Sequence, residues 1–297
     1  MKLEVPVQTW SSRATRCRSA GFTAATALSV ISCGHFDFAA GSLDEPAEPG
    51  DDSMAACASG PSQPVLVQFN HGFSLTSAAD KVPLTVRLDL PAHPGNLLIL
   101  TGADTSGELA MPSAKGTGPW TRPAGTDTYN NSEIWYATIN TSEFDGKVTI
   151  RAADSSGSDS SAMPALRMIL MEWHGLSGDQ DPTDGKVARS GLSQAPGPGA
   201  ITTKNSVDLV LLDVAVDTSD FATSPDGPSD WLLVDTIIAG TNATERAWYR
   251  FTSTPGTFDP TVSITAAGSH QWDASLVAFK VAPPCPVAGR AGSGDLQ

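Results

Sequence analysis

Cysteines, basic residues and aromatic residues are scarce in this chain of 297 residues. Its four cysteines form no C-x-x-C pair, so a thioredoxin-like redox site or a zinc ribbon is not indicated. Lys and Arg number 18 against 32 Asp and Glu, which gives a formal net charge of −14. Such an acidic surface repels phosphates, and we therefore expect neither nucleic acid nor anionic lipid as a partner.

The sequence also lacks a long apolar run and the familiar catalytic motifs. No run approaches the roughly 20 apolar residues that a membrane helix needs. There is no G-x-S-x-G elbow and no H-E-x-x-H pattern. The motifs thus give no indication of a serine hydrolase or a zinc protease, and we predict no catalytic residue from them.

The first residues have the composition of an export signal. Four basic residues precede a short apolar run at 19–32, and the letters VISC follow at 30–33; the basic residues are Lys2, Arg13, Arg16 and Arg18. VISC resembles the lipobox of bacterial lipoprotein precursors, in which the Cys, here Cys33, carries the lipid. The alternative is a plain signal peptide cut after a small-residue site near residue 40.

This interpretation divides the chain into four parts. We expect a signal peptide at 1–32, a lipidated and disordered tether at 33–63, a folded domain at 64–282 and a disordered tail at 283–297. Two acyl chains anchor a protein stably, whereas one does not. The resemblance therefore implies an exported lipoprotein that touches the membrane of the bacterial envelope or surface only through its lipid.

Cys57 and Cys285 flank the folded region at its two ends. An exported protein meets an oxidising compartment, where a bridge between them could persist. We therefore expect a disulfide between these two residues, and two unpaired thiols are the alternative. Mass measurement after alkylation, with and without reduction, distinguishes them.

The folded region consists of short apolar segments separated by Gly, Pro, Asp and Ser, without helical periodicity. Many short strands in about 220 residues are typical of an all-β sandwich or barrel. The expected strands are 65–69, 84–90, 97–103, 133–140, 147–152, 165–173, 208–216, 231–238, 245–252, 261–266 and 274–280.

Four landmarks recur in one order on either side of the apolar segment LRMILMEW at 166–173. They are LLIL (97–100), Trp120, Trp135-Tyr136 and VTI (148–150), then LVLL (209–212), Trp231, Trp248-Tyr249 and VSI (262–264). This indicates an internal duplication. We expect an antiparallel β-sandwich of jelly-roll type with an approximate two-fold repeat, in which residues 65–150 and 169–265 close face to face.

The same landmarks resemble a β-sandwich domain common in secreted bacterial proteins, often beside carbohydrate-active or cell-surface modules. The resemblance is carried by GNLLIL, IWYATI, LRMILMEWHGL, AWYRF and SLVAFK, and it covers most of residues 64–281. It implies a fold and a location, and no single activity or catalytic residue set.

The paired tryptophans have two interpretations. Flat aromatic rings are the usual platform for sugars, but residues repeated by duplication serve the packing that both halves need. We expect Trp120, Trp135, Trp231 and Trp248 to lie in the core. Binding residues are then sought where the halves differ, in the loops 104–119 and 217–230, which carry Glu108, Lys115, Asp220 and Asp226.

An acidic turn in the insertion 176–199 suggests a metal. Asp179, Asp181 and Asp184 precede Gly185, and alternating oxygen ligands before a glycine suit Ca²⁺. The spacing is one residue off the usual calcium loop and no Glu follows at the required distance, so an ordinary turn is the alternative.

Three functions remain open. The first is a cell-surface-anchored, non-catalytic binding or adhesion module whose ligand is a glycan or another surface polymer. The second is a polysaccharide hydrolase that uses Glu172 or other acidic residues, with Glu172 and Glu245 as the candidate carboxylate pair. The structural alternative is a buried Glu172 that is paired with Arg167 or Arg250. The third is a structural envelope lipoprotein.

Overall fold

The computed structural model describes residues 63–75, 83–105, 108–126, 131–153, 165–222, 224–226, 230–240 and 243–283. All of them belong to one compact unit of the chain. These residues form strands, turns and bends, and no helix. Within these ranges there is accordingly no helix long and apolar enough to cross a membrane. The expected signal peptide, Cys33, Cys57 and Cys285 lie outside the described residues.

The strands form four antiparallel sheets, and the expected all-β class is confirmed. Their bounds are β1 Val65–Leu75, β2 Leu84–Arg87, β3 Leu97–Asp104, β4 Leu109–Ser113, β5 Thr121–Gly125, β6 Glu133–Thr138, β7 Lys147–Ala152, β8 Ala165–His174, β9 Thr183–Ser193, β10 Ile201–Thr202, β11 Asp208–Val216, β12 Leu232–Ile238, β13 Thr244–Phe251, β14 Thr257–Phe258 and β15 His270–Lys280.

Two five-stranded sheets make up most of the fold. The first has the order β1-β8-β3-β6-β5 and the second has the order β12-β13-β11-β15-β9. At the centre of the first, Leu100 pairs with Leu170 on one side and with Trp135 on the other. At the centre of the second, Leu212 pairs with Leu276 and with Trp248.

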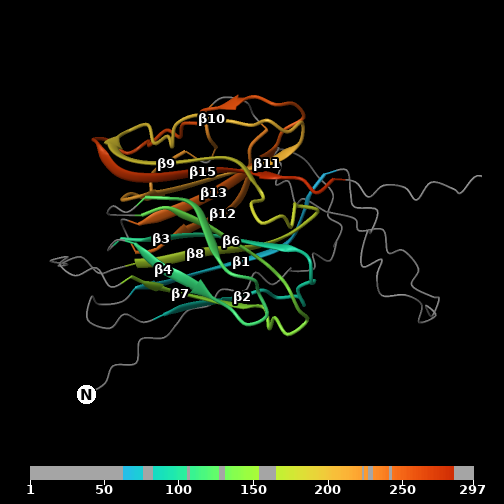
Figure 1. The fold of residues 1–297 in the computed structure, drawn as a ribbon. Coiled ribbons are helices and arrows are strands. Elements are labelled where there is room, and N and C mark those ends of the chain that lie inside the picture. Colours follow the sequence, from blue (N-terminus) through green and yellow to red (C-terminus); the bar gives the residue numbers. More distant parts are fainter. Residues whose placement is uncertain are drawn as a thin grey trace, which may run out of the picture. The chain divides into compact units, whose positions relative to one another are not determined.

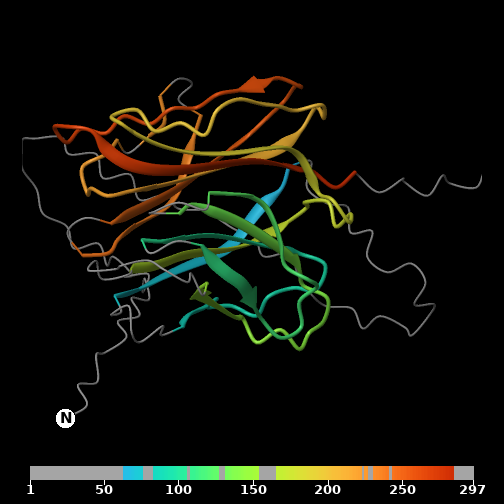
Figure 2. The same ribbon diagram turned by 60° about the vertical axis from the view of Figure 1, so that its left-hand side comes forward.

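The smaller sheets lie outside the larger ones, which gives four layers. From one side to the other, Figure 1 shows β10, the second five-stranded sheet, the first five-stranded sheet, and the sheet β2-β7-β4. The turned view in Figure 2 shows the same order. Because both faces of each large sheet are covered, central strands such as β3 and β11 are buried along their whole length.

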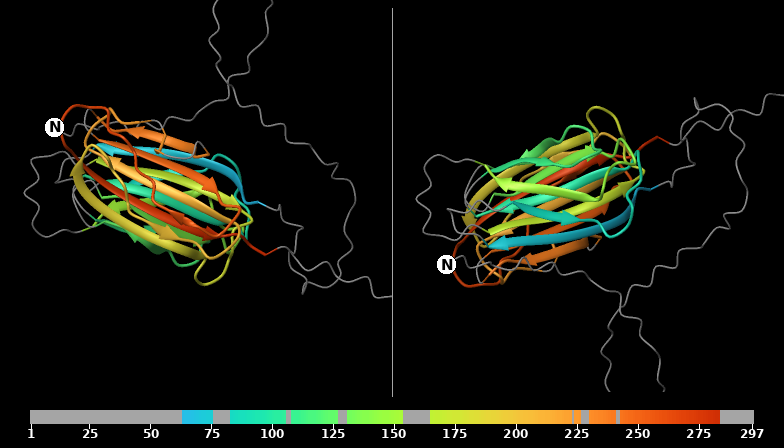
Figure 3. Two further views of the ribbon diagram at one scale, coloured as in Figure 1. Left: turned by 90° about the horizontal axis from the view of Figure 1, so that it is seen from above. Right: turned by 90° about the horizontal axis from the view of Figure 1, so that it is seen from below.

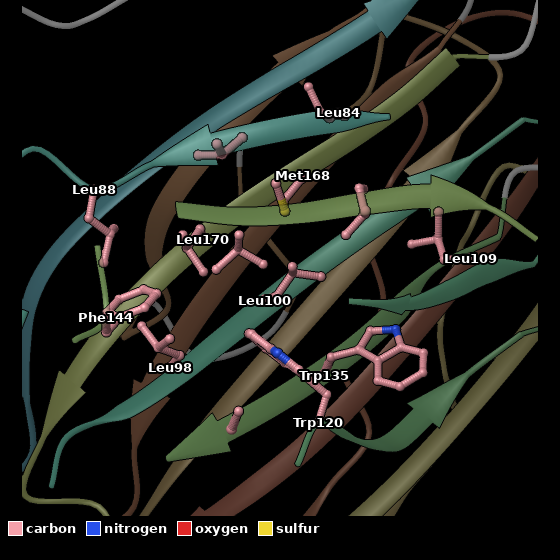
Figure 4. Close-up of a cluster of buried hydrophobic side chains, with 14 of the residues drawn as sticks. Leu84, Leu88, Leu98, Leu100, Leu109, Trp120, Trp135, Phe144, Met168 and Leu170 are labelled. Atoms are coloured by element: carbon pink, nitrogen blue, oxygen red, sulfur yellow. The ribbon is translucent and has the colours of Figure 1, made fainter. Parts of the chain in front are cut away.

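Each contact between layers has its own apolar core. The interlayer, by which we mean the space between the two five-stranded sheets, holds Ile99, Met171 and Trp173 from one sheet and Leu211 and Phe279 from the other. The first sheet packs against β2-β7-β4 through the cluster in Figure 4, which contains several leucines together with Trp120 and Trp135. A third cluster, with Trp231 and Trp248, covers the outer face of the second sheet.

The described residues contain five strands that were not expected, β4, β5, β9, β10 and β14, and one expected strand is not formed. The insertion 176–199, expected to be a loop, contains the eleven-residue strand β9. Loop 104–119 contains β4, whereas segment 261–266 forms only an isolated bridge from Ile264 to Phe221. Edge strand β9 is half-exposed and polar, and it has no apolar pattern typical of a strand. It is a strand because its backbone pairs with β15.

Candidate functional site

All tryptophans of the described residues are buried. Trp120 is 8% exposed, Trp135 and Trp231 are 7% exposed, and Trp248 is fully buried. Trp173 and Trp272 are buried as well. The expectation that the paired tryptophans serve the core is confirmed, and the described residues offer no tryptophan platform for a sugar ring.

The three aspartates expected to bind calcium have separate local roles. Asp181 Oδ1 accepts hydrogen bonds from the backbone N and the Oγ1 of Thr183, and Thr183's hydrogen bonds lower the pKa of Asp181. Asp184 Oδ2 accepts from the backbone N of Asn205 at 2.9 Å, and the backbone N of Asp179 donates to Ser177. No group of three or more acidic, His or Cys side chains in the described ranges is placed to hold a metal. Calcium binding stays a prediction.

The four residues expected in binding loops also have separate neighbours. Glu108 pairs with Arg122, at 3.2 Å. Lys115 pairs with Glu143 at 3.3 Å on an exposed surface, where such a pair contributes little. Asp220 accepts backbone hydrogen bonds from 265 and 266, and Asp226 accepts from the hydroxyls of Thr261 and Ser263. Within the described region, no hydrogen bond or ion pair joins two of these four residues.

Glu172 is a buried carboxylate that accepts hydrogen bonds from three residues of the surrounding strands and loops. Its Oε1 accepts from the backbone N of His93 at 2.8 Å and from Asn96 Nδ2 at 2.6 Å. Its Oε2 accepts from Gln68 Nε2 at 2.6 Å. Arg167 and Arg250, the partners expected from the sequence, bind elsewhere: Arg167 lies next to Glu245, and Arg250 pairs with Asp230 at 2.6 Å.

Glu172 and Glu245 therefore cannot act as a facing pair. Glu172 shares a strand face with Met168 and Leu170, which pack toward β2-β7-β4. Glu245 lies in the interlayer, on the opposite face of the first sheet, where Thr101 Oγ1 donates to its Oε1 at 2.8 Å. Glycoside hydrolysis needs two carboxylates about 5–10 Å apart on either side of one bond, so the expected pairing is wrong.

The interlayer has two chemically different ends. At the aromatic end, Trp173 packs edge-on against Tyr249 and Phe251, with ring centroids 5.1 and 6.2 Å apart. At the polar end, the first sheet contributes a threonine, a serine and an arginine, and the second contributes three acids and a serine. These are Thr101, Ser132 and Arg167, opposite Asp213, Glu245, Asp273 and Ser275, and all seven are fully buried.

Hydrogen bonds cross between the sheets at this polar end. Ser132 Oγ donates to Asp213 Oδ2 at 2.6 Å, and Ser275 Oγ donates to the Ser132 carbonyl at 2.7 Å. Arg167 Nε lies 3.9 Å from Glu245 Oε2. Among the described residues, the guanidinium finds no acceptor within hydrogen-bonding distance, so it acts on the carboxylates as a buried charge.

Burial changes the protonation of these groups. Desolvation raises the pKa of Asp213 well above its ordinary value, and the charge of Glu245 adds to the effect, while Ser132 and Arg167 oppose it. Desolvation also raises the pKa of Glu245, against the opposing charge of Arg167.

Most of the large exposed apolar side chains of the described residues lie on one side of the sandwich. Strands β1 and β12 are the edges of the two large sheets and lie side by side, in blue and orange in Figure 3. Six of the nine large apolar side chains exposed in the described residues lie on them: Val65, Phe69, Leu75, Leu232, Leu233 and Ile238. We call this the β1–β12 side.

A polar contact joins the two edge strands at the middle of this side. His71 Nδ1 of β1 and Asp235 Oδ2 of β12 form a hydrogen bond. That hydrogen bond raises the pKa of His71, and burial opposes it. Phe69, which is 43% exposed, precedes His71 by two residues on the same face of β1.

Sequence reasoning missed the polar end of the interlayer, although a signal was present. Arg167 interrupts the apolar run ALRMILMEW, Asp213 interrupts DLVLLDVAV, and Asp273 lies in WDASLVAF. A charge inside a buried strand requires an internal partner, so these three residues could have been grouped. Which of them meet was decided by the packing of the two sheets.

Comparison of the chain with protein-family models, with curated proteins and with solved structures found no match.

Proposed function

We propose that the chain is a non-catalytic binding or adhesion module that is anchored at a bacterial cell surface and binds a glycan or another surface polymer. The observation that carries this proposal is the division of the described residues into an inert interior and one exposed apolar side. Glu133, Glu172 and Glu245 are fully buried and engaged by protein groups. A hydrolytic carboxylate needs access to the substrate, so the geometry does not favour catalysis.

The β1–β12 side has what a binding surface needs. Phe69 offers an exposed aromatic ring, Leu232 and Leu233 are about half exposed, and the hydrogen bond from His71 to Asp235 fixes the two strands beside each other. Exposed apolar side chains that gather on one side of a folded domain favour an interaction site there. Because the tryptophans are buried, a sugar ring would stack on Phe69.

Within this proposal, the sandwich is of jelly-roll type and arose by internal duplication. Strands β1, β8, β3, β6 and β5 take the places in the first sheet that β9, β15, β11, β13 and β12 take in the second. This correspondence favours halves of 65–174 and 183–280 over the 65–150 and 169–265 expected from the sequence. Superposition of these halves tests the duplication, and strands that fail to overlay would refute it.

Export and lipidation rest on the sequence alone, through VISC at 30–33. Processing at a lipobox attaches a diacyl group to the cysteine, here Cys33, and this lipid would tether the folded domain to the membrane. Metabolic labelling with a palmitate analogue tests this step. Label that persists after Cys33→Ser would show that the anchor is elsewhere.

Binding is tested with the full chain on a glycan array and by co-sedimentation with purified cell-wall polymers. We expect binding that Phe69→Ala and Leu232→Ser each reduce at least about tenfold, since truncating a central contact commonly costs more than 1 kcal/mol. Met111→Ala is the matched control, because Met111 is 67% exposed on β4, in another layer. A chain that binds none of these polymers would favour the structural envelope protein.

A further inference from the structure

Four side chains of the β1–β12 side lie where the interlayer reaches the surface between the two edge strands. Each of them pairs across its ladder with a residue that packs in the interlayer, and paired residues project from the same face of a sheet. The four are Phe69 and His71 of β1 and Leu232 and Asp235 of β12, and we call them the rim. They bring an aromatic ring, an apolar side chain and a polar pair to one strip of surface.

The imidazole of His71 keeps one nitrogen for a ligand. Its Nδ1 is bonded to Asp235, and its side chain is 30% exposed. Its Nε2 has no hydrogen-bond partner among the described residues, and it is not one of their buried polar atoms, so it faces solvent. The other exposed His–Asp pair differs, because His270 Nδ1 contacts Asp217 at 3.0 Å and its Nε2 contacts the Ala267 carbonyl at 3.3 Å.

The aromatic ring and this nitrogen are spaced for one sugar. Phe69 and His71 are two residues apart on the same face of β1, which places their Cα atoms about 7 Å apart. A sugar ring stacked on Phe69 can therefore place a hydroxyl at His71 Nε2. In such a site the apolar contact supplies affinity and the placed hydrogen bond fixes the orientation of the ligand.

The rim offers no net charge to an ionic ligand. Asp235 and His71 are the only acidic or basic side chains within β1 and β12. When the imidazole is protonated, Asp235 compensates its charge, and Glu245 adds a negative charge nearby. Beside β1, Asn70 Nδ2 contacts the carbonyl of Arg87 and the carboxylate of Asp89, whose charges offset each other. The whole chain, with its net charge of −14, repels polyanions.

Resting on the binding function proposed above, we propose that the rim takes an uncharged glycan, with a sugar ring on Phe69 and a hydroxyl at His71 Nε2. A hydroxyl fits both protonation states of the imidazole, because it donates to the neutral Nε2 and accepts from the protonated one. A carboxylate, sulfate or phosphate accepts only from the protonated form, where Asp235 already holds the charge.

Binding of the full chain to matched polymers tests the charge of the ligand. The probes are a glycan array and two pairs that share a backbone: hydroxyethyl with carboxymethyl cellulose, and dextran with dextran sulfate. We expect the bound glycans to be neutral and their acidic counterparts to bind at least about tenfold more weakly. Affinity should change less than about threefold between about 50 mM and about 500 mM salt, because no net ionic attraction is screened.

The outcomes of this experiment separate the two proposals. Tighter binding of the acidic glycans, or affinity that falls steeply with salt, would overturn the uncharged ligand and leave the binding function standing. A chain that binds no glycan on the array and none of the four polymers would overturn both.

His71→Ala tests the hydrogen bond at Nε2. We expect it to weaken binding of the neutral glycan about fivefold, the effect of one ordinary hydrogen bond. His270→Ala is the matched control and should leave the affinity unchanged, because both nitrogens of His270 are engaged and it lies on β15, beside the opposite edge strand β9.

Imidazole nitrogen NMR of the unmodified chain distinguishes a ligand contact from a purely structural role of His71. The Nε2 signal of His71 should shift when the neutral glycan that binds is added to saturation, while the signals of His270 stay in place. A His71 Nε2 signal that does not move in the saturated complex would overturn the assignment, and this measurement does not require that a variant folds.

Discussion

Replacing Glu172 by Gln tests whether this buried carboxylate holds the fold or performs chemistry. Glu172 fastens the connection between β2 and β3, because it accepts from His93 N, Asn96 Nδ2 and Gln68 Nε2. The amide of Gln68 is itself fixed, since its Oε1 accepts from Leu90 N and its Nε2 also donates to the Leu90 carbonyl.

The cost of the change follows from these contacts. A glutamine keeps the two hydrogen bonds at Oε1, but its amino group then faces the amino group of Gln68. The Gln68 amide cannot rotate by 180° to avoid this, because it would lose its two hydrogen bonds to the backbone of Leu90. One hydrogen bond to a charged group, about 1.5–3 kcal/mol, is lost, and the two that remain become weaker. We expect Glu172→Gln to lower the free energy of unfolding by about 3 kcal/mol, or the melting midpoint by about 6–12 °C.

Denaturant unfolding of the full chain, followed by tryptophan fluorescence, measures this loss. Glu143→Gln is the control, because Glu143 is 66% exposed beside Lys115 and we expect a change within about 0.5 kcal/mol. A loss below about 1 kcal/mol for Glu172→Gln would refute the structural role. Abolished polysaccharide cleavage with unchanged stability would point to the hydrolase.

Three further predictions concern other parts of the fold. Trp173→Ala removes both edge-on ring contacts of the aromatic end and should cost about 3–5 kcal/mol in urea unfolding; a loss under about 1 kcal/mol contradicts this. Gly116→Ala should lower stability by at least about 2 kcal/mol, because φ is +78° and the new Cβ would lie 2.5 Å from Phe144 N; an unchanged midpoint contradicts this. Burial and Asp184 raise the pKa of Asp208 to about 7. The free energy of unfolding should therefore fall as the pH rises from about 4 to about 7, and it should fall less in Asp208→Asn. Equal pH profiles of stability for the two proteins would contradict the assignment.

The strong apolar segments were predictable because their pattern is local. Segments LLIL, LRMILMEW and LVLL became β3, β8 and β11, which are buried on both faces. The four paired tryptophans were placed in the core on the argument that both halves need them, and they are buried. A short apolar run between turn residues has few alternatives to a covered strand.

The edges were not predictable in the same way. Strand β9 has Gly185 and Gly191 and alternates weakly, so its sequence reads as a loop. Its eleven residues become a strand because they form backbone hydrogen bonds with the edge of β15 that β11 leaves open. Pairing energy between distant segments decides such a strand, and one sequence window does not contain that energy.

From its sequence alone, the protein was determined to be all-β, acidic, and rich in short buried strands that carry paired tryptophans. These properties depend on composition and on the order of neighbouring residues. Only the tertiary structure decided that Arg167 meets Glu245 in the interlayer, that Glu172 faces the other way, and that β1 and β12 lie together. Those contacts join residues far apart in the chain, and they arise from the way two sheets pack face to face.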